Sequence, residues 1–323
     1  MEILESRIFD ISTPQEFESL AIEIYKFQYQ QNKIYNQFVN QLNLPNPQNI
    51  CEIPFIPISF FKTHQIISSD YPITHKFLSS GTTSQNRSKH LVQNIKLYET
   101  SFLKSYLSFI GNPKDQVILG LLPNYIEQGN SSLVYMVDKL IKETENELSG
   151  FYLKNTDELL KQYQKAICQN KKVVIFGVSY ALLDLAEKNV DLSKATIIET
   201  GGMKGRRKEL SKDQLHEQLK KGLNCEFIAS EYGMTELFSQ SYSNKDGVFK
   251  LPNWMQVIIR DINDPLSYVK NGKTGGINVI DLANLYSCSF IATQDLGKIN
   301  NGMLQLMGRF DNSDIRGCNL MVE

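Results

Sequence analysis

Four short apolar runs that alternate with helical patterns constrain the fold of this chain more than any other feature. They lie at 117–122, 173–176, 196–199 and 226–229, and glycines or polar residues bound them. Buried parallel strands read as nearly continuous apolar runs, because helices cover both faces of their sheet. The sequence therefore predicts an α/β fold with a parallel-rich sheet covered by helices.

Both ends of the chain depart from this alternation. Residues 14–42 carry apolar side chains at helical spacing, and Thr13-Pro14 is a suitable helix start. The expected buried positions are Phe17, Leu20, Ile24, Phe27, Ile34, Phe38 and Leu42. After about residue 247, strand-like segments at 257–260, 276–282 and 304–307 follow one another without a long helix. We expect a helical segment at 1–50, a core at 51–311 with a smaller β-rich layer, and a tail at 312–323.

Composition excludes several classes of partner. Lys and Arg number 34 and Asp and Glu 35, so no net field favours nucleic acid or an anionic membrane. No apolar run approaches the roughly 20 residues that span a bilayer.

The five cysteines form no C-x-x-C pair, which argues against a zinc site and a disulfide framework. With no signal-peptide pattern at the N-terminus, we expect a cytoplasmic protein with reduced thiols.

A small polar loop is the first of three segments that suggest nucleotide chemistry. Ser79, Ser80, Gly81, Thr82 and Thr83 offer hydroxyls and backbone N–H groups without bulk, and such a loop can wrap phosphate oxygens. It is not a Walker A loop, because the second glycine of that pattern is missing. An ordinary polar turn is the competing interpretation.

The second segment is Tyr232-Gly233-Met234-Thr235-Glu236, which follows an apolar run. Ligands of α/β sheets bind at such strand ends. Tyr232 can stack on a base, Thr235 can bond a phosphate, and the Glu236 carboxylate is a hard ligand suited to Mg²⁺. A solvated turn after a strand would look the same.

The third segment contains an acidic and a basic residue. Asp295, in Thr293-Gln294-Asp295, can accept hydrogen bonds from ribose hydroxyls, and Arg309, in Gly308-Arg309-Phe310-Asp311, carries a fork of donors that suits ribose or phosphate. A turn aspartate and a surface ion pair are the alternatives.

In this order the segments, with Gly201-Gly202 between the first two, resemble the core motifs of the adenylate-forming enzymes. The resemblance spans residues 79–311. It implies ATP and Mg²⁺ as cofactors. It also implies that Glu236 is the metal ligand and that Glu236 and Thr83 are catalytic residues. It further implies that Ser79 to Thr83, Gly201, Gly202, Tyr232 to Thr235, Asp295 and Arg309 bind the nucleotide. The chain departs from the pattern of these enzymes at two places. Ser84 stands where the polar loop usually has a glycine. Only twelve residues follow Asp311 in this sequence, whereas the common enzymes continue into a C-terminal domain with a catalytic lysine.

Within that superfamily the chain is similar to the LuxE-type acyl-protein synthetases, which lack this domain. The similarity includes residues 53–62, the 199–205 loop and Arg316-Gly317-Cys318. It implies activation of a fatty acid or another carboxylic acid, transfer of the acyl group to Cys318 as a thioester, and delivery to an acyl-reductase partner. Thiolates are suitable acyl acceptors. An oligomeric assembly is compatible with these expectations.

Three other functions remain open from the sequence. A CoA ligase would use CoA as the acceptor, and a non-catalytic nucleotide-binding scaffold would only hold a reductase. A serine hydrolase is suggested by Gly177-Val178-Ser179-Tyr180-Ala181 with Asp184 and His216 in Ser-Asp-His order. The hydrolase leaves the three nucleotide-type segments unexplained.

Overall fold

The first of two large sheets carries the alternating part of the chain, in a computed structural model that describes residues 2–80, 87–123, 129–201, 207, 210–243 and 247–310. Its strand order is β5-β4-β6-β7-β8-β9, parallel except for the β8–β9 pair. The strands are β4 (Gln116–Leu121), β5 (Gly150–Phe151), β6 (Lys172–Val178), β7 (Ala195–Thr200), β8 (Ala229–Tyr232) and β9 (Ser241–Ser243). The α/β prediction is confirmed, although β8 begins where the predicted run ends.

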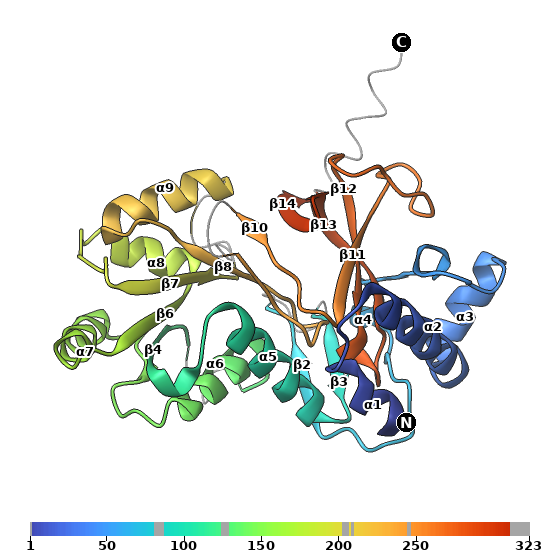
Figure 1. The fold of residues 1–323 in the computed structure, drawn as a ribbon, viewed down its shortest axis with the longest axis horizontal. Helices are drawn as coiled ribbons and strands as arrows, with labels where there is room; N and C mark the ends of the chain where they lie inside the picture. The colour runs from blue at the N-terminus through green and yellow to red at the C-terminus, as the bar shows by residue number, and fades with distance from the viewer. Residues whose placement is uncertain are drawn as a thin grey trace, which may run out of the picture.

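Five helices cover this sheet. They are α5 (Ile95–Phe109), α6 (Ser132–Glu143), α7 (Thr156–Cys168), α8 (Ser179–Ala186) and α9 (Lys212–Leu223). Figure 1 shows α8 and α9 on one side of the sheet and α5 and α6 on the other. Ser131 and Ser211 cap α6 and α9 by accepting from backbone N–H groups of the first turn, which starts each helix where the sequence predicted it.

The second sheet forms the β-rich layer and also has six strands. They are β10 (Val248–Phe249), β11 (Met255–Arg260), β12 (Gly275–Asp281), β13 (Phe290–Asn300), β14 (Met303–Arg309) and, paired in parallel with β13, β1 (Ile56–Pro57). The sequence missed β13, the eleven-residue strand that contains Asp295. A separate hairpin of β2 (His75–Leu78) and β3 (Lys89–Val92) bears the Ser79–Ser80 segment.

The predicted helical N-terminus is present as α1 (Glu2–Ile8), α2 (Pro14–Gln31) and α3 (Lys33–Leu42). Thr13 and Glu16 form a reciprocal capping box at the start of α2. Phe17, Leu20 and Ile24 are buried as expected, but Phe27, Ile34, Phe38 and Leu42 are only partly buried. The buried positions shift to Gln28 and Tyr35 because their polar atoms find carbonyl partners at Asn284, Leu285 and Pro54.

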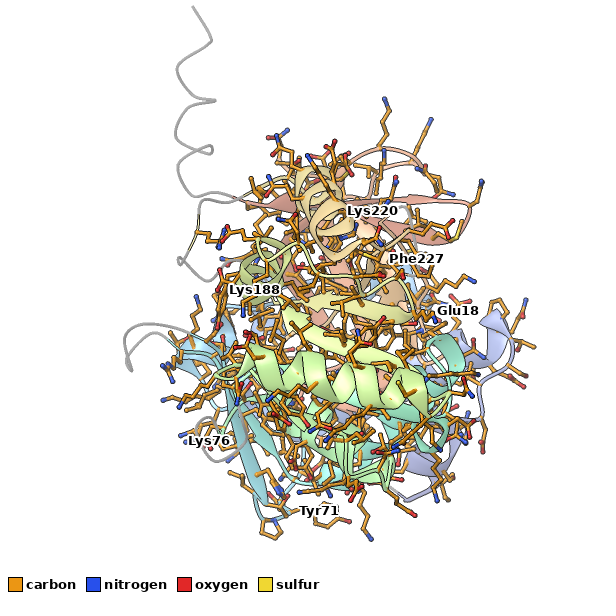
Figure 2. All side chains as sticks on the ribbon, turned by 90° about the vertical axis from the view of Figure 1, so that its left-hand side faces the viewer. Glu18, Tyr71, Lys76, Lys188, Lys220 and Phe227 are labelled. Atoms are coloured by element: carbon orange, nitrogen blue, oxygen red, sulfur yellow. The ribbon has the colours of Figure 1, made fainter. Side chains whose placement is uncertain are left out.

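The remaining short helices are α4 (Phe60–Thr63) and the 3₁₀ turns Ile50–Glu52, Pro113–Asp115 and Leu282–Asn284. Charged side chains such as Lys188 and Lys220 lie on the outside of the layers, as Figure 2 shows. No helix in the described part of the chain is both long and apolar enough to cross a bilayer.

Candidate functional site

Two predicted residues lie at the carboxyl edge of the parallel sheet. Gly201 directly follows β7 and Tyr232 ends β8, and the two strands pair through Ile198–Ala229 and Glu199–Ser230. The backbone φ of Gly201 is 74°, a left-handed conformation that glycine adopts without strain. Because ligands of α/β sheets bind outside the carboxyl ends of the strands, this edge is the candidate site.

Tyr232, Asp295 and Arg309 form one hydrogen-bonded chain across the two sheets. The Tyr232 hydroxyl donates to Asp295 Oδ2 at 3.0 Å, and Arg309 Nε donates to Asp295 Oδ1 at 2.7 Å. Burial, reinforced by the charge of Asp295, raises the pKa of Tyr232 well above its usual value. The Arg309 side chain remains 73% exposed while Asp295 is 9% exposed. Arg309 therefore keeps donors available for a ligand, and each carboxylate oxygen of Asp295 keeps accepting capacity.

Glu236 lies in the turn after β8, and its side chain is buried. Burial raises its pKa, whereas a hydrogen bond from Ser88 and the charges of Arg309 and Lys62 lower it. Among the described residues, no three His, Cys, Asp or Glu side chains gather as a complete metal site. A single carboxylate is nevertheless compatible with Mg²⁺ in a nucleotide site, because that ion takes most of its ligands from phosphates and water.

Two polar side chains to which the sequence analysis gave no role contact the backbone carbonyls of Thr235 and Glu236. His90 Nδ1 lies 2.8 Å from the Thr235 carbonyl oxygen, and Asn284 Nδ2 donates to the Glu236 carbonyl at 2.7 Å. The His90 ring stacks on Phe238 with centroids 4.7 Å apart. Burial lowers the pKa of His90 to about 4, so this imidazole is neutral. His90 stood near the polar loop in sequence, but Asn284 gave no sequence signal.

Ser79 closes the neck of the β2–β3 hairpin. Its N–H donates to the Ser88 carbonyl at 3.1 Å, and its Oγ accepts from the Ser88 N–H at 2.9 Å. Ser80 is exposed at the start of the loop. Since Ser88 also bonds Glu236, the hairpin neck and the turn after β8 meet. Gly81, Thr82, Thr83, Gly202 and Cys318 lie outside the described residues.

The middle of the Tyr232–Glu236 segment is tightly fitted. A Cβ on Gly233 would lie 2.3 Å from Glu231 Oε1, so a larger residue there would displace that carboxyl group. Met234 packs partly buried against the core, and Thr235 is partly exposed.

A buried ionic network ties together the strand ends at this edge, and the sequence did not reveal it. The Glu199 carboxylate accepts from Ser179 Oγ at 2.5 Å, from Ser230 Oγ at 3.3 Å and from Lys212 Nζ. Burial opposes ionisation of Glu199, but the charge and hydrogen bond of Lys212 hold its pKa below the usual value. On the neighbouring positions Thr200 donates to Glu231 at 2.5 Å, and burial raises the pKa of Glu231 to about 7.

The serine hydrolase alternative is wrong. Ser179 is fully buried and donates to Glu199, while His216 contacts Ser230 at 3.2 Å. Asp184 forms an ion pair with Arg207 on the surface. The three side chains therefore do not form a nucleophile, base and orienting acid.

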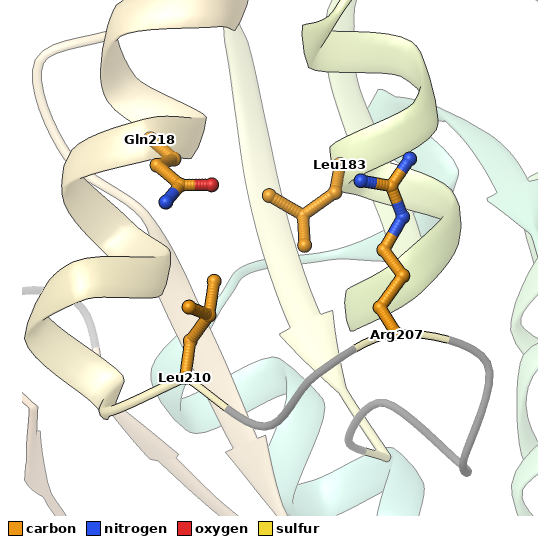
Figure 3. Close-up of a pocket in the computed structure, with 4 residues that line it drawn as sticks. All are labelled: Leu183, Arg207, Leu210 and Gln218. Atoms are coloured by element: carbon orange, nitrogen blue, oxygen red, sulfur yellow. The ribbon is translucent and has the colours of Figure 1, made fainter.

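A pocket of about 300 Å³ lies elsewhere, between α8 and the segment leading into α9. Figure 3 shows Leu183, Arg207, Leu210 and Gln218 around it. None of these residues belongs to the predicted nucleotide segments.

Comparison with known proteins assigns a family. The family model described as "Acyl-protein synthetase, LuxE" matches residues 2–323. This chain belongs to the LuxE acyl-protein synthetase family. A search of curated protein sequences finds no match.

Solved structures share the fold of this LuxE family member. ATP-bound MatB from Rhodopseudomonas palustris is 17% identical, with a TM-score of 0.56 over 75% of this chain and 50% of that one. The 2-hydroxyisobutyryl-CoA ligase in complex with 2-HIB-AMP is 11% identical, with a TM-score of 0.65 over 94% of this chain and 70% of that one. The chain thus spans about half the length of the MatB structure, and at these identities the likeness concerns the fold alone.

Proposed function

We propose that the chain is an ATP-dependent acyl-protein synthetase of the cytoplasm that activates a fatty acid as acyl-AMP and transfers the acyl group to Cys318. The observation that carries the proposal is the Tyr232–Asp295–Arg309 chain, which joins the carboxyl edge of one sheet to the second sheet. The family match over residues 2–323 supports the same chemistry.

Nucleotide binding is assigned to the side chains at this edge. Tyr232 and Gly201 would line the base, Asp295 and Arg309 would bind the ribose hydroxyls, and Thr235 would bond a phosphate oxygen. The polar loop, including Gly81, Thr82 and Thr83, would supply further donors, with Gly202 beside Gly201 and with Gly233 and Met234 shaping the turn. Glu236 would hold Mg²⁺, which offsets phosphate charge when bound.

The proposed reaction has two steps. A carboxylate oxygen of the acid attacks the α-phosphorus of ATP, and the bond to pyrophosphate breaks. The Cys318 thiolate then attacks the acyl carbonyl, AMP leaves, and a thioester forms. The thioester retains a reactive acyl group, which a reductase partner would accept.

Incubation with ATP, Mg²⁺ and labelled fatty acids of graded length tests this function, with C318A beside the wild type. We expect label on the wild type that hydroxylamine removes, and C318A that releases pyrophosphate without becoming labelled. Labelled acyl-CoA after addition of CoA, without label on the protein, would instead favour the CoA-ligase alternative. Absence of pyrophosphate release with every acid would contradict adenylation and favour a scaffold.

A further inference from the structure

The segment at residues 53–62 is similar to the LuxE-type synthetases, but the proposed site gives it no role. It ends on a lysine, Lys62. Within it, β1 pairs in parallel with β13, where Pro57 lies opposite Ala292. Ala292 precedes Asp295 by three positions on the same strand. The segment therefore runs along β13 in the direction of Asp295 and then turns into the short helix α4, which contains Lys62.

An aromatic contact fixes α4 beside the turn that carries Glu236. The Phe61 side chain is fully buried, and its ring meets the His90 ring edge-on, with the centroids 5.7 Å apart. His90 Nδ1 lies 2.8 Å from the carbonyl oxygen of Thr235, the residue before Glu236. One imidazole thus connects α4 to the turn, and Lys62 is the next residue of α4 after Phe61.

The charge of Lys62 acts on this turn. Lys62 is exposed, whereas its neighbour Phe61 is buried. Burial raises the pKa of Glu236, and the positive charges of Arg309 and Lys62 are among the influences that lower it. Because water and salt screen exposed charges over distances of about 10 Å, this effect indicates an ammonium group near the Glu236 carboxylate.

A cation at this place would offset the charge of a bound triphosphate. Other cations of the site are already engaged with carboxylates, because Arg309 pairs with Asp295 and Lys212 pairs with Glu199. The ion pairs between described residues do not include Lys62. Its ammonium is therefore available to an anionic ligand that reaches Glu236.

We propose that Lys62 is a catalytic residue of adenylation, whose ammonium binds the phosphates of ATP that leave as pyrophosphate. The inference rests on the proposed function. When a carboxylate oxygen of the acid bonds the α-phosphorus, the bond from that phosphorus to the bridging oxygen of the β-phosphate breaks, and its electron pair stays on pyrophosphate. The Lys62 ammonium stabilises the negative charge that develops there and transfers no proton. Lys62 therefore acts in the first step and not in the transfer to Cys318.

Separate measurement of the two steps tests this role in K62M and K62R. A preorganised donor aimed at developing charge is worth about 100-fold in rate, so we expect pyrophosphate release by K62M to slow by about that factor. The affinity for ATP, measured by calorimetry, should fall by less than about ten-fold, because the interaction is strongest in the transition state. K62R keeps the charge and should be faster than K62M. Acyl transfer from synthetic acyl-AMP should stay near the wild-type rate in both variants.

Protection of lysines by ATP gives a readout that does not depend on turnover. Acetic anhydride acetylates exposed lysines, and mass spectrometry of peptides reports each one separately. We expect ATP with Mg²⁺ to slow acetylation of Lys62 but not of Lys33, an exposed lysine at the start of α3. K33M is the matched control for the rates and should release pyrophosphate at the wild-type rate.

Four results would overturn the proposal. They are pyrophosphate release by K62M at the K33M rate, equal slowing of both steps in K62M, a K62R variant no faster than K62M, and acetylation of Lys62 that ATP does not slow. Because Lys62 is exposed, we expect K62M to unfold at the urea concentration of the wild type. If K62M does not fold, K62R and the acetylation experiment decide. A wild type that releases no pyrophosphate with any acid would refute the proposed function, and this inference with it.

Discussion

Carboxyl groups crowd the edge at which the proposed nucleotide binds. Glu199, Glu231, Glu236 and Asp295 all lie within or beside this edge, although a triphosphate is itself an anion. Two features reduce the negative charge. Lys212 pairs with Glu199, and the raised pKa of Glu231, about 7, leaves that carboxyl partly protonated at neutral pH.

The Lys212–Glu199 pair predicts a rescue between two substitutions. K212M leaves the Glu199 carboxylate, 4% exposed, without its cation, so we expect the free energy of unfolding to fall by about 2–3 kcal/mol. The double variant E199Q/K212M removes both charges and should recover at least half of that loss in urea denaturation. If the loss of unfolding free energy in the double variant equals the sum of the losses in K212M and E199Q, the two residues are not energetically coupled.

His90 predicts a pH dependence with a definite sign. Its pKa is lowered from 6.5 to about 4 in the folded protein, so below pH 6.5 the unfolded chain binds a proton that the native imidazole does not. Stability from this group is therefore complete above about pH 6.5 and is lost progressively as the pH falls toward 4, by about 2 kcal/mol at pH 5.

H90Q isolates this term from the other titrating groups. At pH 7.5 we expect H90Q to be less stable than the wild type, because the contacts of His90 with Thr235 and Ser287 are weakened. At pH 5 the difference in free energy of unfolding should shrink by about 2 kcal/mol. A difference that stays constant between these pH values would contradict a neutral, buried His90.

At the scale of elements, helix starts and parallel strands could be predicted because local signals specify them. Thr13, Ser131 and Ser211 cap helices where the sequence suggested, and apolar runs mark β4, β6 and β7. The strand β13 was missed because Thr293, Gln294 and Asp295 interrupt its apolar pattern. Buried Thr293 and Asp295 are satisfied by Ile277, Tyr232 and Arg309, which are distant in sequence.

In the candidate site, too, the sequence did not reveal contacts between residues that are distant in the chain. Motif order identified Tyr232, Asp295 and Arg309, whose side chains do contact one another. Lys212 and Asn284 were missed because their partners are a carboxylate and a backbone carbonyl supplied by other elements. Such partners become visible only when the sheets are assembled.

The packing of α9 on α8 predicts an effect opposite to helix propensity. Alanine normally stabilises a helix relative to glycine by about 1 kcal/mol. At Gly222, however, a Cβ would lie 2.4 Å from the Ala186 carbonyl oxygen. We expect G222A to destabilise the protein by about 1–3 kcal/mol in thermal or urea unfolding. K221A changes the adjacent exposed position of α9 and should leave the free energy of unfolding nearly unchanged. A G222A variant more stable than the wild type would show that α8 and α9 can move apart without cost.

At the scale of the whole molecule, the N-terminal helices are joined to the second sheet by buried contacts. Gln28 Nε2 donates to the Asn284 and Leu285 carbonyls and its Oε1 accepts from the Ser289 N–H. The Tyr35 ring stacks on Phe290 at 6.1 Å. These contacts connect α2 and α3 to the start of β13 and to Asn284, which holds the Glu236 carbonyl.

This connection predicts that α2 unfolds together with β13 and not as a separate unit at residues 1–50. In native-state hydrogen exchange at increasing urea, buried amides of α2 should open with free energies within about 1 kcal/mol of those of β13. Q28L should lower both sets together, because it removes the four hydrogen bonds that the Gln28 side chain makes to Asn284, Leu285 and Ser289. Y29F, which loses only an exposed bond to Asn40, should lower neither. If Q28L accelerates exchange in α2 while β13 keeps its protection, the helical segment unfolds as a unit of its own. The contacts that connect α2 through Asn284 to Glu236 would then not couple the stability of α2 to that of β13.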